Sequence, residues 1–177
     1  MKPFPEIKLY GANGCHKSQY YALLLQEKGL DFKFLDVETN QDHANELREL
    51  YTNGKLNYPT ITIGAKKLRN PTKEELSKWI DKLIPERIPL VHDIDNARFT
   101  LLVAGELAKV TYRLEGNTMY LTHSEVPYTL RGIGIGKVLV EKTFEKLKEE
   151  GYDGVAICSF IKATAQRSQK WKENISY

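Results

Sequence analysis

The chain of 177 residues is 41% hydrophobic and 28% charged, with a formal net charge of +3. These values are ordinary for a globular protein, and the charges spread almost evenly over both halves, which gives no basic patch for nucleic acid. No apolar run approaches the roughly 20 residues of a transmembrane helix, and the N-terminus lacks the apolar core of a secretory signal. We therefore expect a cytoplasmic protein of one or two domains whose partners include neither nucleic acid nor membrane.

The first half of the chain shows alternating strand and helix patterns. In order, the predicted elements are a strand at 7–10, a helix at 15–28, a strand at 31–37, a helix at 42–51, a strand at 60–63 and a helix at 72–83. The last helix opens with a capping box formed by Thr72 and Glu75. Pro85 and Pro89 then break the helix, so we predict two domains, residues 1–86 and 87–177.

The second half begins with three strands and ends with helices. Turn-like pairs join strands predicted at 98–103, 106–114 and 118–125, which form an antiparallel meander. A helix at 137–150, a strand at 155–158 and a helical stretch to about residue 171 follow. The sequence thus predicts an α/β domain followed by an α+β domain.

A glycine-rich segment, RGIGIGK at 131–137, joins the third strand of the meander to a helix. Backbone N–H groups and a helix N-terminus converge there, which is suited to binding a phosphate. The spacing fits neither the dinucleotide fingerprint nor the Walker loop. A simple turn that begins a helix is the alternative.

The RxxGxG spacing, with the Val126-Pro127 strand end before it and a helix after it, resembles the acyl-CoA loop of GNAT acetyltransferases. The resemblance implies that acetyl-CoA is the cofactor and that its pyrophosphate lies on the loop. The cofactor-binding residues that it implies are Val126, Arg131, Gly132, Ile133, Gly134, Ile135, Gly136 and Lys137.

Two polar residues near the end of the same strand are candidates for acid–base chemistry. His123 and Glu125 are two apart, so both project from one face of the strand and could activate an amine. The alternative is that they are ordinary hydrogen-bonded polar residues.

The two cysteines lie far apart in the sequence, which in a cytosolic protein favours free thiols, and no metal site is predicted. Cys15 stands between the first strand and first helix, where backbone N–H groups and Lys17 favour a thiolate. Tyr58-Pro59 precedes the third strand and is a candidate cis peptide. The alternative is that Cys15 is a leftover thiol in a domain that only packs or binds.

These two features resemble the thioredoxin superfamily, and residues 6–84 resemble a glutaredoxin of the mycoredoxin branch. The resemblance implies monothiol chemistry at Cys15, because Ser18 replaces the resolving cysteine. It also implies a thiol-substrate site formed by Lys17, Ser18, Tyr58, Pro59, Thr60 and Asn70. Ala12 replaces a lysine typical of glutathione-binding members, and residues 70–72 replace a glycine pair. Glutathione or another low-molecular-weight thiol is the ligand implied.

Cys158 ends a strand and begins the last helix, as a late cysteine does in a small GNAT subgroup that residues 90–171 resemble. That resemblance implies a nucleophile or acyl carrier, whereas a small buried hydrophobe is the alternative. The leading hypothesis is an acetyl-CoA-dependent N-acetyltransferase of unknown amine or thiol acceptor, fused to a glutaredoxin-like thiol domain. The alternative is a thiol–disulfide protein whose GNAT-like half only binds CoA or a partner. The sequence does not predict the oligomeric state.

Overall fold

The structure is a computed structural model that describes residues 4–177. Contacts divide the chain into two compact units, residues 1–77 and 78–177, which we describe separately. This division falls inside helix α3 (Lys73–Leu83). The domain boundary that the sequence places after residue 86 stays a prediction.

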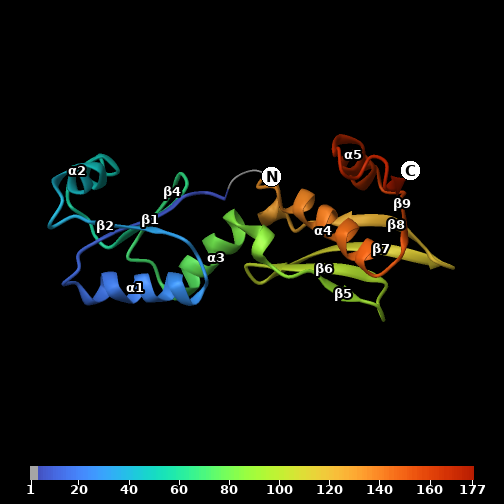
Figure 1. Cartoon of the computed structure of the whole chain (residues 1–177), viewed down its shortest axis with the longest axis horizontal. Coiled ribbons are helices and arrows are strands. Elements are labelled where there is room, and N and C mark those ends of the chain that lie inside the picture. Colours follow the sequence, from blue (N-terminus) through green and yellow to red (C-terminus); the bar gives the residue numbers. More distant parts are fainter. Residues whose placement is uncertain (1–3) are drawn as a thin grey trace. The chain divides into compact units, whose positions relative to one another are not determined.

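The first unit contains a four-stranded sheet in the order β2-β1-β3-β4 (Figure 1). Strand β1 is parallel to β2 and antiparallel to β3, and β3 and β4 form an antiparallel pair. The elements before α3 are β1 (Ile7–Gly11), α1 (His16–Glu27), β2 (Lys33–Asp36), α2 (Gln41–Glu49), β3 (Thr60–Ile63) and β4 (Lys66–Arg69). The order agrees with the sequence prediction, to which the structure adds β4.

Helices α1 and α2 cover opposite faces of this sheet (Figure 1). Tyr10 of β1 packs with Ala44 and Leu47 of α2. Successive side chains of a strand point to opposite faces, so the fully buried Leu9 faces the α1 side. Thr72 caps α3 as predicted, because its hydroxyl accepts a hydrogen bond from the Glu75 N–H at 3.1 Å.

The second unit contains a six-stranded sheet in the order β10-β9-β8-β7-β6-β5. Strands β5 to β8 form antiparallel pairs, and β9 is parallel to both β8 and β10. The elements after α3 are η1 (Pro85–Arg87), β5 (Val91–Asp93), β6 (Arg98–Val103), β7 (Glu106–Glu115), β8 (Thr118–Glu125), η2 (Tyr128–Leu130), α4 (Ile135–Glu149), β9 (Asp153–Ala156), α5 (Ser159–Arg167) and β10 (Ile175–Ser176). The predicted meander is therefore present.

Helices α4 and α5 pack on one face of the six-stranded sheet (Figure 1). Phe99, Leu101 and Val110 of the meander share a core cluster with Phe144 of α4 and Ile161 of α5. The side chains that alternate with them point to the other face. Burial of one face and not the other explains the regular alternation that made these strands predictable.

The last helix is shorter than the sequence predicts. Helix α5 ends at Arg167, because Ser168 turns to an extended conformation, whereas the sequence predicts helix to about residue 171. Trp171 is still buried, against Phe144 with ring centroids 5.4 Å apart. Within residues 4–177, no helix is both long and apolar enough to cross a membrane.

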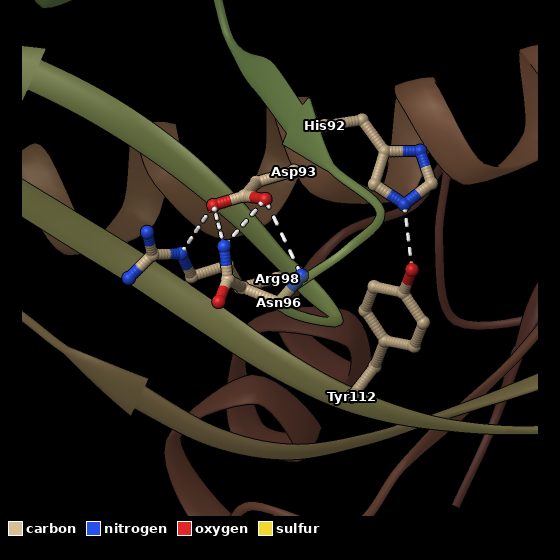
Figure 2. Close-up of polar contacts among 5 residues, drawn as sticks. All are labelled: His92, Asp93, Asn96, Arg98 and Tyr112. Atoms are coloured by element: carbon tan, nitrogen blue, oxygen red, sulfur yellow. Dashed lines mark hydrogen bonds and ion pairs between the residues drawn. The ribbon is translucent and has the colours of Figure 1, made fainter.

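A buried histidine joins the edge strand β5 to the end of α4. The side chain of His92 is 5% exposed and stacks on Phe99 at 4.2 Å. Its Nε2 bonds the Tyr112 hydroxyl at 2.8 Å (Figure 2), and its Nδ1 bonds the Glu150 carboxylate at 2.6 Å. Both ring nitrogens are therefore satisfied, as burial requires.

The turn after β5 is held by a carboxylate. Asp93 accepts hydrogen bonds from the Asn96 amide and from the Arg98 Nε, the latter at 2.7 Å (Figure 2). The Asn96 side chain first, and then Arg98, lower the pKa of Asp93. These bonds fix the β5–β6 turn.

We predict that Tyr112→Phe lowers the free energy of unfolding of the second unit by about 1–2 kcal/mol, because it leaves the buried His92 Nε2 without its partner. Tyr120→Phe is the matched control, since its hydroxyl bonds no described side chain. Urea unfolding followed by tryptophan fluorescence reports on this unit through Trp171, which is buried against Phe144 of its core. An equal loss in the two variants would contradict the prediction.

Candidate functional site

Cys15 begins helix α1. It is the N-cap residue in an extended conformation, and its carbonyl accepts a hydrogen bond from the Gln19 N–H at 3.1 Å. The hydroxyl of Ser18, followed by the backbone N–H groups of Ser18 and Lys17, lowers the pKa of the half-buried Cys15 thiol. Because the thiolate is the reactive form, this arrangement favours nucleophilic chemistry.

The serine that donates to Cys15 is fixed in a tight packing arrangement. Ser18 is fully buried, and its Oγ accepts a hydrogen bond from the Ala12 N–H at 3.1 Å. A Cβ on Gly11 would lie 2.5 Å from this oxygen, so only glycine fits there. The Ser18 hydroxyl is thus held in place from both sides.

A pocket of about 330 Å³ lies in the first unit, lined by Lys17, Tyr58, Pro59, Arg69 and Asn70. The Tyr58-Pro59 peptide bond is cis, as the sequence suggests. The hydrogen bond from the Tyr58 hydroxyl to Glu38 raises the pKa of Tyr58. Lys17, two residues after Cys15, brings the first turn of α1 to the pocket.

Four of the residues predicted for the thiol site line this pocket, and two do not. Ser18 contacts Cys15 instead, and the buried Thr60 bonds the Tyr51 hydroxyl and the Asn57 carbonyl. Sequence reasoning missed Arg69, because it lies on β4, a strand that the sequence pattern did not indicate.

The glycine-rich loop of the second unit precedes α4. Gly132 and Gly134 have φ of 77° and 91°, which side chains rarely adopt, and Gly134 is the N-cap of α4. A Cβ on Gly136 would lie 3.1 Å from the ring of Phe160. The first turn of α4 carries no acidic residue, so its N–H groups are suited to an anion.

The other predicted cofactor residues are placed differently. The Arg131 Nε donates a hydrogen bond to the Val126 carbonyl at 3.0 Å, which ties the loop to the end of β8. Ile133 is 42% exposed, whereas Ile135 is fully buried in the core. Lys137 is exposed beside Glu141.

Strand β8 loses one of its neighbours near this loop. Its pairing with β9 stops at Leu121, whose carbonyl accepts hydrogen bonds from both Ile157 and Cys158, whereas its pairing with β7 continues to Glu125. Across residues 122–125, the backbone groups that point away from β7 therefore have no strand partner in the described chain. This open edge can hydrogen-bond an extended ligand that carries amides.

Cys158 borders this open edge as the N-cap of α5. Its Sγ lies 3.6 Å from the Ser124 Oγ. Burial raises the pKa of the Cys158 thiol, but hydrogen bonds from the Ile161 N–H and the Ser124 hydroxyl outweigh this, so the net shift is downward. Cys158 therefore lies beside the open edge and carries a polarised thiol.

His123 and Glu125 lie on the opposite face of β8 from Ser124. A register shift opposite Thr111 and Tyr112 makes Thr122 an extra residue, so Ser124 pairs with the buried Val110. His123 and Glu125 are exposed on one face, as predicted. The Glu125 carboxylate contacts Lys109 at 3.0 Å, and this contact lowers its pKa.

The two thiols each have a serine partner, which makes a reciprocal prediction possible. We expect Ser18→Ala to raise the pKa of Cys15 and leave that of Cys158 unchanged, and Ser124→Ala to do the reverse. The pH dependence of iodoacetamide alkylation, measured at each cysteine by peptide mass, should shift to higher pH only at the affected thiol. A shift at both thiols, or at neither, would refute the assignment.

Comparison with known proteins finds one family match in each half of the chain. Residues 9–86 match the family model of the glutathione S-transferase N-terminal domain, and residues 98–174 match that of the GCN5-related N-acetyl-transferase. A glutaredoxin of solved structure from Archaeoglobus fulgidus is similar, with 19% identity over 47% of this chain and 89% of its own length and a TM-score of 0.37. No curated protein matches the chain. The chain therefore carries a thioredoxin-like N-terminal domain and a GCN5-related acetyltransferase domain.

Proposed function

We propose that the second domain transfers the acetyl group of acetyl-CoA to an amine or thiol acceptor. The observation that carries this proposal is the open edge of β8, which connects the glycine-rich loop to Cys158. A pyrophosphate needs N–H donors and an approach free of side chains, and a pantetheine arm needs a partner for its amides. The N–H groups of residues 132–136 would meet the first requirement, and the backbone of residues 122–125 the second.

Each part of the site would hold a different part of the donor. The N–H groups of residues 132–136, at the N-terminus of α4, would bind the pyrophosphate. The backbone of residues 122–125 would bind the pantetheine amides. Acetyl-CoA supplies an acetyl group already activated as a thioester, so the protein's task is to position it and to stabilise the charge that develops.

Cys158 is the proposed nucleophile. Its thiolate would attack the acetyl carbonyl, and the bond to sulfur of CoA would break, so that CoA leaves as a thiolate and takes a proton from water. The acceptor would then attack the acetyl group on Cys158 and release the cysteine, and the Ser124 hydroxyl would keep its sulfur polarised. Direct transfer to the acceptor is the alternative route, in which Cys158 only contacts the donor.

His123 and Glu125 suit the acceptor side of the reaction. Glu125, kept ionised by Lys109, can attract a cationic amine, but its low pKa makes it a weak base. His123 is the better candidate for the base that removes the amine proton. His123 and Glu125 lie on one face of β8, whereas Ser124 and Cys158 lie on the other. The acceptor could therefore approach the open edge from one face of the strand and the acetyl donor from the other.

We propose thiol–disulfide exchange at Cys15 as a second function. The lowered pKa of Cys15 and the pocket beside the cis Tyr58-Pro59 bond favour it. Ser18 provides no second thiol, so exchange would proceed through a mixed disulfide with glutathione or another low-molecular-weight thiol.

We expect Gly134→Asp to weaken acetyl-CoA binding by at least about tenfold, because it places a carboxylate where the loop would meet a phosphate. Gly116→Asp is a matched control, since Gly116 also has a positive φ and open space but lies in the β7–β8 turn. Isothermal titration with acetyl-CoA measures both. Parent-like binding by Gly134→Asp, or no binding by the parent, would refute the proposed donor site.

A covalent step at Cys158 has a direct readout. Brief incubation with acetyl-CoA should add the mass of one acetyl group to the peptide that contains Cys158. We expect the label to persist in Cys15→Ser and to disappear in Cys158→Ser. If Cys158→Ser still acetylates amines at the parental rate, the nucleophile assignment is wrong and direct transfer is supported.

A further inference from the structure

A buried carboxylate lies beside the loop that begins α1. Asp36 is the last residue of β2, where it pairs with Gly11 at the end of the parallel strand β1. It is 8% exposed, and its carboxylate accepts three backbone hydrogen bonds. The Thr39 N–H first, and then those of Asn13 and Glu38, outweigh burial and lower the pKa of Asp36. The carboxylate is therefore ionised at neutral pH and held by the backbone around it.

One oxygen of this carboxylate holds the chain just before Cys15. The Asn13 N–H donates to the Asp36 Oδ2 at 3.1 Å. The Cys15 N–H donates to the Ala12 carbonyl at 3.0 Å, and the Gln19 side chain donates to the Asn13 carbonyl at 3.1 Å. These last two bonds stay within the loop and its helix, whereas the bond to Asp36 ties the loop to β2.

The other oxygen holds a second part of the pocket lining. The Glu38 and Thr39 N–H groups both donate to the Asp36 Oδ1 at 2.9 Å. The Glu38 carboxylate in turn accepts a hydrogen bond from the Tyr58 hydroxyl at 2.6 Å. Because Tyr58 lines the pocket together with Lys17, one carboxylate connects the start of α1 to the part of the lining that carries the cis peptide bond.

We propose that Asp36 is a positioning residue for Cys15, whose carboxylate holds the start of α1 and the Tyr58 side of the pocket in the arrangement that thiol exchange requires. The inference builds on the proposed exchange at Cys15 and adds a residue that acts on it through the Asn13 N–H. Cys15 enters α1 in an extended conformation. The N–H groups of the first helical turn can stabilise its thiolate only while that entry is kept.

The charge and the position of Asp36 have opposite effects on the thiol, which makes its role testable. A nearby carboxylate repels a thiolate, so loss of the charge alone would lower the pKa of Cys15. Loss of the helix entry would weaken the N–H bonds to the thiolate and raise that pKa. The Ser18 hydroxyl and the N–H groups of this turn lower the pKa of Cys15 more than burial and the Glu38 charge raise it. We therefore expect the position of Asp36 to decide the sign.

Two variants remove the same hydrogen bond from its two ends. Asp36→Asn keeps an oxygen for the Glu38 and Thr39 N–H groups, but its amide NH₂ cannot accept from the Asn13 N–H. Asn13→Pro keeps the carboxylate and removes the donor. Asn13 is exposed and has a negative φ, which proline requires. Glu38→Gln is the matched control, because it removes a charge from the same turn but keeps an acceptor for the Tyr58 hydroxyl.

The pH dependence of iodoacetamide alkylation, followed on the full chain by the mass of each cysteine peptide, measures the effect. We expect Asp36→Asn and Asn13→Pro to move the Cys15 profile up by about half a pH unit, which leaves roughly threefold less thiolate at neutral pH. Glu38→Gln should leave the profile in place or move it down. Cys158 in the same samples is the internal reference and should not change.

The positioning role is overturned if the Cys15 profile of Asp36→Asn stays in place or moves to lower pH, or if Cys158 shifts equally. If circular dichroism shows that one of the two variants does not fold, the other decides in the same way. Exchange itself is measured separately with 2-hydroxyethyl disulfide. The Cys15 thiolate attacks one sulfur, and the other half leaves as a thiolate that takes a proton from water. A parent chain that is alkylated at Cys15 but forms no mixed disulfide would refute the proposed exchange and not the role of Asp36 in holding the thiol.

Discussion

The extra residue in strand β8 determines how the candidate acetyltransferase site is arranged. Side chains of a regular strand alternate, so residues 119, 121, 123 and 125 would all face the core. The bulge at Thr122 reverses the alternation and brings Ser124 to the core face. As a result, Ser124 reaches Cys158 while His123 and Glu125 face the opposite side. His123 and Glu125, whose burial without partners would cost free energy, are thus exposed to solvent.

In the same region, β8 stops pairing with β9 but continues to pair with β7. Leu121 accepts hydrogen bonds from two successive N–H groups at the end of β9, which closes that ladder, and the chain then turns into α5. Strand β8 nevertheless continues along β7 to Glu125. A rigid scaffold therefore presents backbone groups that have no strand partner within residues 4–177, beside a helix N-terminus and a thiol to which the Ser124 backbone also hydrogen-bonds. Because the edge is supported by β7, it needs little ordering before a ligand binds.

The sequence predicted most of the fold where one face of an element is buried. Strands β6 to β8 alternate because α4 and α5 cover one face, and the capping box identified α3. The strands missed were β4, β5 and β10, which are short or largely charged and depend on neighbours for pairing. The bulge left no mark in the sequence, since the residues 122–125 around it are all polar. Arg69 was missed with its strand.

The two cysteines show how differently a similar local chemistry can be built. At Cys15, the serine is three residues away on the same helix turn, so a sequence motif is enough to indicate it. At Cys158, the serine comes from a strand 34 residues earlier and reaches the thiol only through the bulge and the closed β8–β9 ladder. The first arrangement depends on one helix start and its packing against Gly11. The second requires the intact sheet, so local opening of β8 would remove the serine partner and the open edge together. Polarisation of Cys158 is therefore coupled to the integrity of the proposed donor site, whereas that of Cys15 is a local property of its helix.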